Sequence, residues 1–312
     1  MVTQPSRRAF LTGRRTPATP WGQFCARLSR TCEGSVSWNQ DEQNTEAWLK
    51  PARAVDVMHA QALCRELGVQ LILLSSDAKP DPGRPVLWVD SRAEWARLDL
   101  VDAAAGLWRA DAGVTLWSLR QQEVGIFAET FDATHSHQTV AQWFANPFEG
   151  NLKRSGIVQA EVLLADGTLE MLGPFGASAS RPLKSLSLQK KIPTLFELAQ
   201  SSQAALCAQC EYWPLRYRLD SLMPQAGGSF NLAWLFQGHG GSLAWLQALW
   251  FQTPMHASMV TESLPTLKDS VDPVAVRQAA LELDQSIKQT LDPTGVFGQT
   301  PPAKGLESTQ LT

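Results

Sequence analysis

The chain has 312 residues, of which 44% are hydrophobic and 18% are charged, and its formal net charge at pH 7 is −3. This composition is typical of a soluble globular protein with a sizeable core, and it excludes the broad basic field used by nucleic-acid-binding proteins. No apolar run approaches the roughly 20 residues that span a bilayer, so the sequence predicts no transmembrane segment.

Residues 1–47 are predicted to form an Arg- and Pro-rich N-terminal arm. The first 32 positions contain six arginines and no acidic residue, and Pro5, Pro17 and Pro20 interrupt any long helix. Residues 6–11, Ser-Arg-Arg-Ala-Phe-Leu, resemble a twin-arginine export signature, but the polar residues at positions 12–28 leave no apolar stretch for export. We therefore expect a cytoplasmic protein.

A helix and several strands are predicted next. Apolar residues recur at helical spacing before Gly68, a typical helix end, and they are Val55, Met58, Ala62, Leu63 and Leu67. Strands are expected at residues 69–74, 85–90 and 106–111, followed by a helix at about 116–123. An alternating strand at 155–164 then ends in an Asp166-Gly167 turn.

The second half is predicted to form a smaller unit. Its expected elements are a helix at 195–204, strands at 212–219 and 230–236, and a helix at 242–251. A last helix at 273–291 ends in Asp-Pro-Thr-Gly-Val-Phe at 292–297, and the tail at 299–312 has the composition of disorder.

The order of motifs between residues 108 and 172 resembles a known family. A strand ends in Ala-Asp-Ala-Gly-Val-Thr-Leu at 110–116, a helix follows, and Thr-Val-Ala-Gln-Trp stands at 139–143 before the alternating strand. This order is similar to the PCMH-type FAD-binding domain of FAD-linked oxidases in the vanillyl-alcohol oxidase superfamily, which includes the FAD subunits of glycolate oxidase and D-lactate dehydrogenases. The resemblance covers roughly residues 48–172, with a weaker match at 292–297.

The resemblance implies an α+β fold, with a PCMH-type FAD-binding domain of two α/β lobes at residues 48–175 and a small, reduced α+β cap at 190–270. The C-terminal helix and its return, at 271–298, would tie the cap to the first domain. The implied cofactor is FAD, and the matching positions are Ser75, Ser76, Asp77, Thr139, Val140, Ala141, Gln142, Gly156, Ile157 and Val158.

Two of these three segments depart from the family pattern. The family binds the FAD diphosphate with backbone amides of glycine-rich loops, which anionic oxygens can approach closely. Here the first loop reads Ser-Ser-Asp-Ala-Lys-Pro at 75–80, and Ala141 and Gln142 replace a Gly-Gly pair. Retained FAD binding and loops that only close the sheet are both open interpretations.

Catalytic candidates are few. His135 and His137 precede the second loop and would serve as a base or donor near neutral pH, or simply as polar loop residues. Arg216 and Arg218 alternate on an expected strand, where they would clamp a substrate carboxylate or only solvate an exposed face. His239 lies in the glycine-rich turn at 238–241, which would hold an anion or only connect two elements.

The cysteines suggest a metal site only as a distant alternative. Cys207 and Cys210 have the spacing of a metal-binding pair, and Cys25 with Cys32 would complete four ligands. The six residues between the latter two are too many for a tight zinc knuckle. We expect free, reduced thiols and no metal.

Two functions follow from these observations. The first is an FAD-linked oxidoreductase, or the FAD-domain subunit of one, that acts on a small 2-hydroxy acid such as glycolate or lactate. The alternative is a flavin-free accessory subunit that keeps the FAD-oxidase fold and contacts a partner subunit of a flavin oxidase complex.

Overall fold

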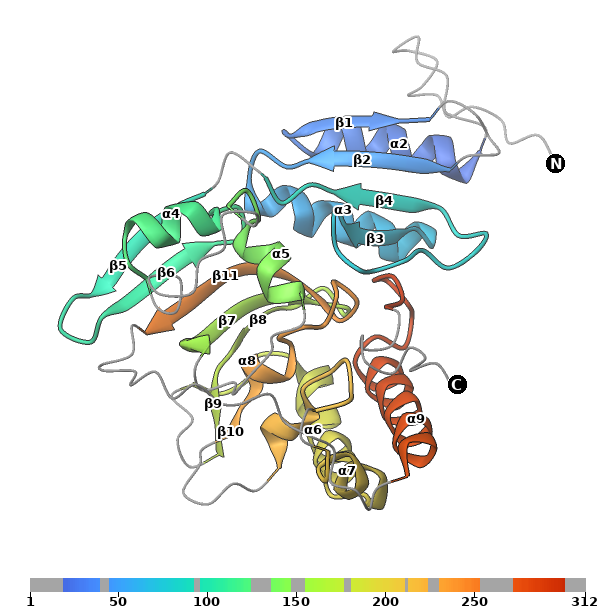
Figure 1. Cartoon of the computed structure of the whole chain (residues 1–312). Helices are drawn as coiled ribbons and strands as arrows, with labels where there is room; N and C mark the ends of the chain where they lie inside the picture. Colours follow the sequence, from blue (N-terminus) through green and yellow to red (C-terminus); the bar gives the residue numbers. More distant parts are fainter. Residues whose placement is uncertain are drawn as a thin grey trace, which may run out of the picture.

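The computed structural model describes residues 19–39, 45–92, 96–124, 136–146, 155–176, 181–210, 213–223, 230–252 and 272–300. It confirms the α+β class: helices and strands alternate in a first lobe, followed by a larger sheet and a group of helices (Figure 1). Within the described residues, no helix combines the length and apolar character needed to cross a membrane.

The first lobe is a four-stranded sheet in the order β1-β2-β4-β3, with α2 and α3 packed on one side of it (Figure 1). Strand β1 runs antiparallel to β2, whereas β2, β4 and β3 are parallel. Its elements are α2 (Pro20–Thr31), β1 (Ser35–Trp38), β2 (Glu46–Lys50), α3 (Ala54–Leu67), β3 (Gln70–Leu73) and β4 (Val86–Val89).

Half of the expected N-terminal arm therefore belongs to this lobe. Helix α2 begins at a Thr19 cap and buries Phe24 and Leu28 in the main core. The helix predicted from the apolar spacing before Gly68 is α3, and Gly68 ends it in the left-handed conformation, with φ of 70°.

The second lobe is a five-stranded antiparallel sheet in the order β5-β6-β11-β7-β8. Helices α4 and α5 follow β6, and α5 packs against β11. The elements of this part are β5 (Leu98–Asp102), β6 (Leu107–Asp111), α4 (Leu116–Gln121), α5 (Val140–Ala145), β7 (Ile157–Leu164), β8 (Leu169–Leu172) and β11 (Ala244–Gln252).

The remaining elements lie below this sheet in Figure 1. They are β9 (Pro174–Phe175), α6 (Leu186–Ala199), α7 (Ser202–Cys207), a 3-10 turn at Leu219–Leu222, β10 (Phe230–Asn231), α8 (Leu232–Leu235) and α9 (Pro273–Leu291). The long C-terminal helix packs on α6 and α7, and its bounds agree with those predicted from the sequence.

The predicted helix at 242–251 is wrong, because these residues form β11, the central strand of the second sheet. Nearly every residue of β11 is apolar and buried, so the sequence shows no clear periodicity. Such an apolar run is compatible with a helix as well as with a buried strand. The expected cap at 190–270 therefore shares its longest strand with the sheet of the expected FAD-binding domain.

Two predicted strands are also wrong. Residues 213–218 form no strand and lead into the 3-10 turn, while the expected strand at 230–236 is only two residues long before α8 begins. The helix predicted at 195–204 is α6 followed by α7, and it starts earlier, at Leu186, where Ser185 accepts a hydrogen bond from the amide of Leu188. Ser185 is thus the N-cap that marks the start of α6.

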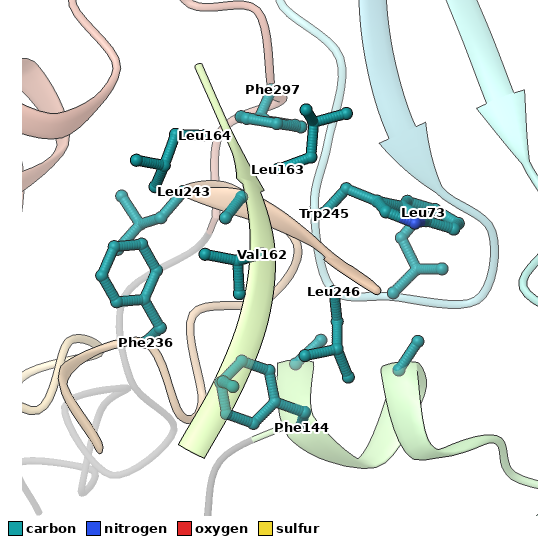
Figure 2. Close-up of a cluster of buried hydrophobic side chains, with 14 of the residues drawn as sticks. Leu73, Phe144, Val162, Leu163, Leu164, Phe236, Leu243, Trp245, Leu246 and Phe297 are labelled. Atoms are coloured by element: carbon teal, nitrogen blue, oxygen red, sulfur yellow. The ribbon is translucent and has the colours of Figure 1, made fainter. Parts of the chain in front are cut away.

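One core joins the two lobes. Leu73 of β3 lies beside the Trp245 ring of β11, and Phe297 of the C-terminal return lies near Leu163 of β7 (Figure 2). Phe144 of α5 lies at the lower end of the cluster, below Leu246 and Val162 in the view (Figure 2). These side chains are almost completely buried, so the seam between the lobes is a packed hydrophobic interface.

Candidate functional site

The first loop of the expected cofactor cradle follows β3 and is closed by backbone hydrogen bonds. Ser75 is exposed and has a positive φ of 65°, and the amide of Ser76 donates to the Leu73 carbonyl at 3.2 Å. The amide of Ala78 donates to the carbonyl of Gly240 at 3.0 Å. Two of the backbone amides in this loop, those of Ser76 and Ala78, thus already have acceptors within the protein.

The second segment forms the start of α5. Thr139 is its N-cap: the Thr139 hydroxyl accepts from the Gln142 amide at 3.3 Å, and the Gln142 side-chain oxygen accepts from the Thr139 amide at 3.0 Å. The two intervening amides donate to carbonyls of the segment after β6, from Val140 to Val114 at 2.8 Å and from Ala141 to Ala112 at 3.0 Å. All four backbone amides of residues 139–142 are therefore satisfied.

The side chain of Gln142 also reaches across to the first loop. Its Nε2 donates to the carbonyl of Leu74 at 3.2 Å. The hydroxyls of Thr139 and Ser91 lie 2.7 Å apart and form a second link between the lobes. The residue that stands where the family pattern has glycine thus joins the two loops and fills the space that a glycine would leave open.

A third link involves the acidic residue of the first loop. Asp77 forms an ion pair with Arg216 at 2.9 Å, and the Arg216 side chain is only 2% exposed. The glycine-rich turn lies equally close, because a Cβ atom at Gly241 would come within 3.0 Å of the Ser76 hydroxyl. The carboxylate of Asp77 therefore supplies the anion for a buried arginine at the edge of the first loop.

Helix α9 holds this arginine in place through a buried carboxylate. Asp284 accepts hydrogen bonds from the backbone amides of Arg216 at 2.9 Å and Tyr217 at 3.1 Å. Burial raises the pKa of Asp284 to about 7, although these two hydrogen bonds act in the opposite direction. The hydroxyl of Tyr217 lies 2.8 Å from that of Ser242, which ties the same segment to the start of β11.

One turn further along α9, Lys288 fixes the C-terminal return. Its ammonium group donates to the Ser242 carbonyl, the Asp292 carboxylate and the Phe297 carbonyl at 2.7, 2.7 and 3.0 Å. Burial lowers the pKa of Lys288, against the effect of Asp292. The return then pairs with β3, where the Leu71 amide donates to the Val296 carbonyl at 2.8 Å.

The third matching segment, Gly156 to Val158, begins β7. Gly156 has φ of 69°, and a Cβ there would come within 2.9 Å of the Gln252 carbonyl oxygen, so the turn itself requires glycine. Ile157 pairs with Phe251 at one end of β11, whereas Leu163 pairs with Trp245 at the other. Six residues of strand, roughly 20 Å, separate this segment from the joined loops.

The predicted catalytic residues do not converge on one point. His135 lies outside the described residues, and His137 is exposed two residues before the α5 cap. Arg216 and Arg218 are not on a strand, which corrects that prediction, and they have separate acidic partners: Arg218 binds Asp220 at 2.7 Å. A shared carboxylate clamp is therefore absent from this pair.

His239 is buried beside Phe144, with ring centroids 5.7 Å apart, and its Nδ1 accepts from the Leu243 amide. Burial lowers the pKa of His239 to about 3, and the nearby cations Arg216 and Lys288 lower it further. The imidazole is thus neutral near pH 7 and holds the turn before β11.

The cysteines are free thiols. Cys25, Cys32, Cys64 and Cys207 are buried and Cys210 is half-buried. Burial raises the pKa of Cys207 to about 11, so this thiol is a poor metal ligand or nucleophile. No group of three or more His, Cys, Asp or Glu side chains suited to a metal occurs in the described part of the chain.

The described residues do not fit an FAD diphosphate between the two loops. The amides of residues 139–142 are bonded internally, Gln142 spans the gap, and the nearby Arg216 is already paired with Asp77. A surface pocket of about 310 Å³ lies away from these loops, between α6, α7 and α9.

Two residues that shape this region were not singled out from the sequence: Asp284 and Lys288. They are spaced four residues apart along α9, in a row next to the apolar stripe that predicted the helix, and Asp292, the first residue of the 292–297 motif, is the C-cap of the same helix. Such a polar row beside a buried stripe indicates charged side chains directed toward partners at the edge of the core.

Comparison with known proteins gives a similar arrangement in several oxidases. The 4-ethylphenol oxidase from Gulosibacter chungangensis aligns with 81% of this chain at 14% identity and a TM-score of 0.43. 6-Hydroxy-D-nicotine oxidase from Arthrobacter nicotinovorans aligns with 71% of this chain at 13% identity and a TM-score of 0.42. Carbohydrate oxidase from Microdochium nivale aligns with 73% of it at 12% identity and a TM-score of 0.40. No protein-family profile and no curated protein sequence matches the chain.

The chain spans less than half of each of these oxidases, covering 44%, 42% and 42% of their lengths in the same order. At these identities and scores, the similarity assigns neither a substrate nor a cofactor to this chain.

Proposed function

We propose that this protein is a flavin-free accessory subunit of an FAD-linked oxidoreductase, and that it keeps the FAD-oxidase fold without using its cofactor site. The sequence resemblance to FAD-linked oxidases supports the fold assignment. The single observation that carries the functional conclusion is the Gln142 side chain, which caps α5 and donates to the Leu74 carbonyl across the cleft.

The physical argument is that diphosphate binding requires free, convergent amides and close approach to bare backbone. In this chain the amides of residues 139–142 have protein acceptors, as do those of Ser76 and Ala78 in the first loop. Opening the loops for FAD would break these hydrogen bonds and separate Asp77 from the buried Arg216, and an unpaired buried cation is costly. The closed state is therefore the stable one, and the role left to the protein is to support a partner subunit.

A flavin titration tests the first half of this proposal. The full chain, purified without added cofactor, should be colourless in the flavin absorption bands and should leave the fluorescence of added FAD unquenched. The partner role is tested by isolating the tagged chain from its own cells. A flavoprotein should co-purify with it, and removal of this chain should lower that flavoprotein's oxidase activity. A yellow chain that retains FAD after separation from all partners would refute the accessory role.

The second candidate is an FAD-linked oxidoreductase that acts on a small 2-hydroxy acid such as glycolate or lactate. One observation favours it: the two loops expected to hold the diphosphate do face each other at the lobe junction, linked by Gln142 and by the Ser91–Thr139 pair. Stoichiometric FAD in the purified chain, together with reduction of that FAD by glycolate or lactate, would select this function.

A further inference from the structure

The edge strands of the two larger sheets differ in how they are protected from pairing with another chain. An exposed strand border presents unpaired amides and carbonyls, and proteins normally cover it, add charge to it or distort it with a bulge. The outer border of β3 is covered by the C-terminal return, where Leu71 pairs with Phe297. On β8, the side-chain carboxylate of the buried Glu170 accepts from the amides of residues 184–185, so the segment before α6 lies against this strand.

Strand β5 is protected by charge and by distortion. It carries Asp99 and Asp102, and its pairing with β6 shifts register between Leu100 and Asp102. Arg97 forms an ion pair with Asp99 at 2.8 Å, so both signs of charge occur at this border. A second strand would meet charged side chains and an irregular backbone there.

Strand β1 has none of these protections. Its sequence, Ser35-Val36-Ser37-Trp38, contains no charge and no proline, and its pairing with β2 is regular. Among the described residues, no backbone hydrogen bond reaches its outer side. Strand β1 is the outermost strand of the first sheet, with α2 behind it (Figure 1).

The hydrogen-bond pattern between β1 and β2 shows which backbone groups of β1 point away from the sheet. The Asn39 amide donates to the Glu46 carbonyl at 3.0 Å, so Asn39, Ser37 and Ser35 direct their backbone groups toward β2. Val36 and Trp38 therefore direct theirs outward. Trp38 is 39% exposed, which is high for a tryptophan next to a core strand.

We propose that β1 pairs with β1 of a second copy of this chain, antiparallel and centred on Ser37, to form one continuous eight-stranded sheet. In this register Val36 of each copy faces Trp38 of the other, and their outward amides and carbonyls form four hydrogen bonds. Ser37 meets Ser37 across the two-fold axis as a close, non-hydrogen-bonded pair, where small side chains fit.

A second copy is the occupant that the chemistry of this border favours. The border is neutral, so no like charges oppose each other when it pairs with itself. The two-fold axis is perpendicular to the sheet and keeps α2 of both copies on the same face. The exposed Trp38 ring gains apolar contact with Val36 of the other copy. Val36 already packs against the core of its own lobe.

The test is the oligomeric state of the full chain, measured by sedimentation velocity over a wide range of concentrations. We expect the wild type to sediment with twice the mass of a single chain. Ser37→Lys places two ammonium groups opposite each other at the axis and should abolish the dimer, while its circular dichroism spectrum stays unchanged because Ser37 is exposed.

Two further variants make the assignment specific. Trp38→Ser should raise the dimer dissociation constant ~10-fold or more through lost apolar burial. Ser202→Lys introduces the same charge at an exposed serine on α7, far from β1 (Figure 1), and should leave the dimer intact. A wild type that is monomeric at every concentration, or a Ser37→Lys protein that still dimerises, would overturn the proposal.

Discussion

The link between the two loops makes a direct prediction for Gln142. In the Gln142→Ala variant, the capping interaction with the Thr139 amide and the donation to the Leu74 carbonyl are both lost. Gln142 is 6% exposed, so water does not freely replace these bonds. A buried hydrogen bond contributes about 1 kcal/mol, and an unsatisfied buried partner costs about 1–3 kcal/mol. We therefore expect a loss of about 2–4 kcal/mol of unfolding free energy.

Urea unfolding followed by circular dichroism measures this loss. Gln122→Ala is the matched control, because Gln122 is the exposed C-cap of α4 and its side chain has no hydrogen bond to any residue that the structure describes. The Gln142→Glu variant separates the two contributions. It keeps an acceptor for the Thr139 amide but turns a carboxylate oxygen toward the Leu74 carbonyl, so it should also be less stable than the wild type.

The same position gives a second readout with FAD itself. If the closed loops keep FAD out, the double variant Ala141→Gly with Gln142→Gly should quench the fluorescence of added FAD where the wild type does not. If Gln142→Ala were no less stable than the wild type, within the roughly 0.5 kcal/mol typical of surface changes, the proposed link would be refuted.

Three other predictions concern the buried charges. The raised pKa of Asp284, about 7 against an ordinary 3.8, favours the protonated form in the folded state, so its contribution to stability is present at low pH and is lost as pH rises toward 7. The stability advantage of Asp284→Asn over the wild type should therefore grow between about pH 5 and pH 8, by roughly 2–3 kcal/mol, in urea titrations; a constant difference would contradict the assignment. Asp77→Asn should cost about 2 kcal/mol by leaving Arg216 unpaired, and a second change, Arg216→Met, should recover most of it in a double-mutant cycle. Lys288→Met should cost about 3 kcal/mol, since Asp292 and two carbonyls lose their donor, and an unfolding midpoint equal to wild type would exclude this role.

The elements with strong local signals were predictable. Helix α3 has both apolar periodicity and a Gly68 end, and α9 has a proline at its first position and an Asp-Pro stop, so sequence and structure agree closely there. Strand β7 was recognised because it alternates and runs into an Asp-Gly turn. In each case the local pattern and the tertiary environment favour the same structure.

Strand β11 was not predictable in this way. Its residues are buried on both faces at the centre of the sheet, which removes the alternation that marks a half-exposed strand. The spacing of Leu243, Leu246 and Leu249 then fits a helix equally well. Only the pairing of β11 with β6 and β7 decides between the two, and that pairing involves residues at least 80 positions away.

The candidate site shows the same division. The sequence located both loops and noted that glycine was replaced, but it left open whether the new side chains leave room for a cofactor. That answer depends on where Gln142 and Asp77 find partners, and these partners, Leu74 and Arg216, come from distant segments. Sequence patterns record the type of residue in a loop, whereas its hydrogen-bond partners are set by how the lobes pack.

Several contacts, rather than a single one, hold the two loops together at the lobe junction. Gln142 joins the two loops, Asp77 joins the first loop to Arg216, and the Ala78 amide joins it to Gly240. Because α9 in turn fixes Arg216 through Asp284, removal of one contact leaves the others in place. The lobes are therefore held as a unit by partly independent bonds, and a rigid lobe junction is what a subunit needs if it contributes a fixed surface instead of cofactor chemistry.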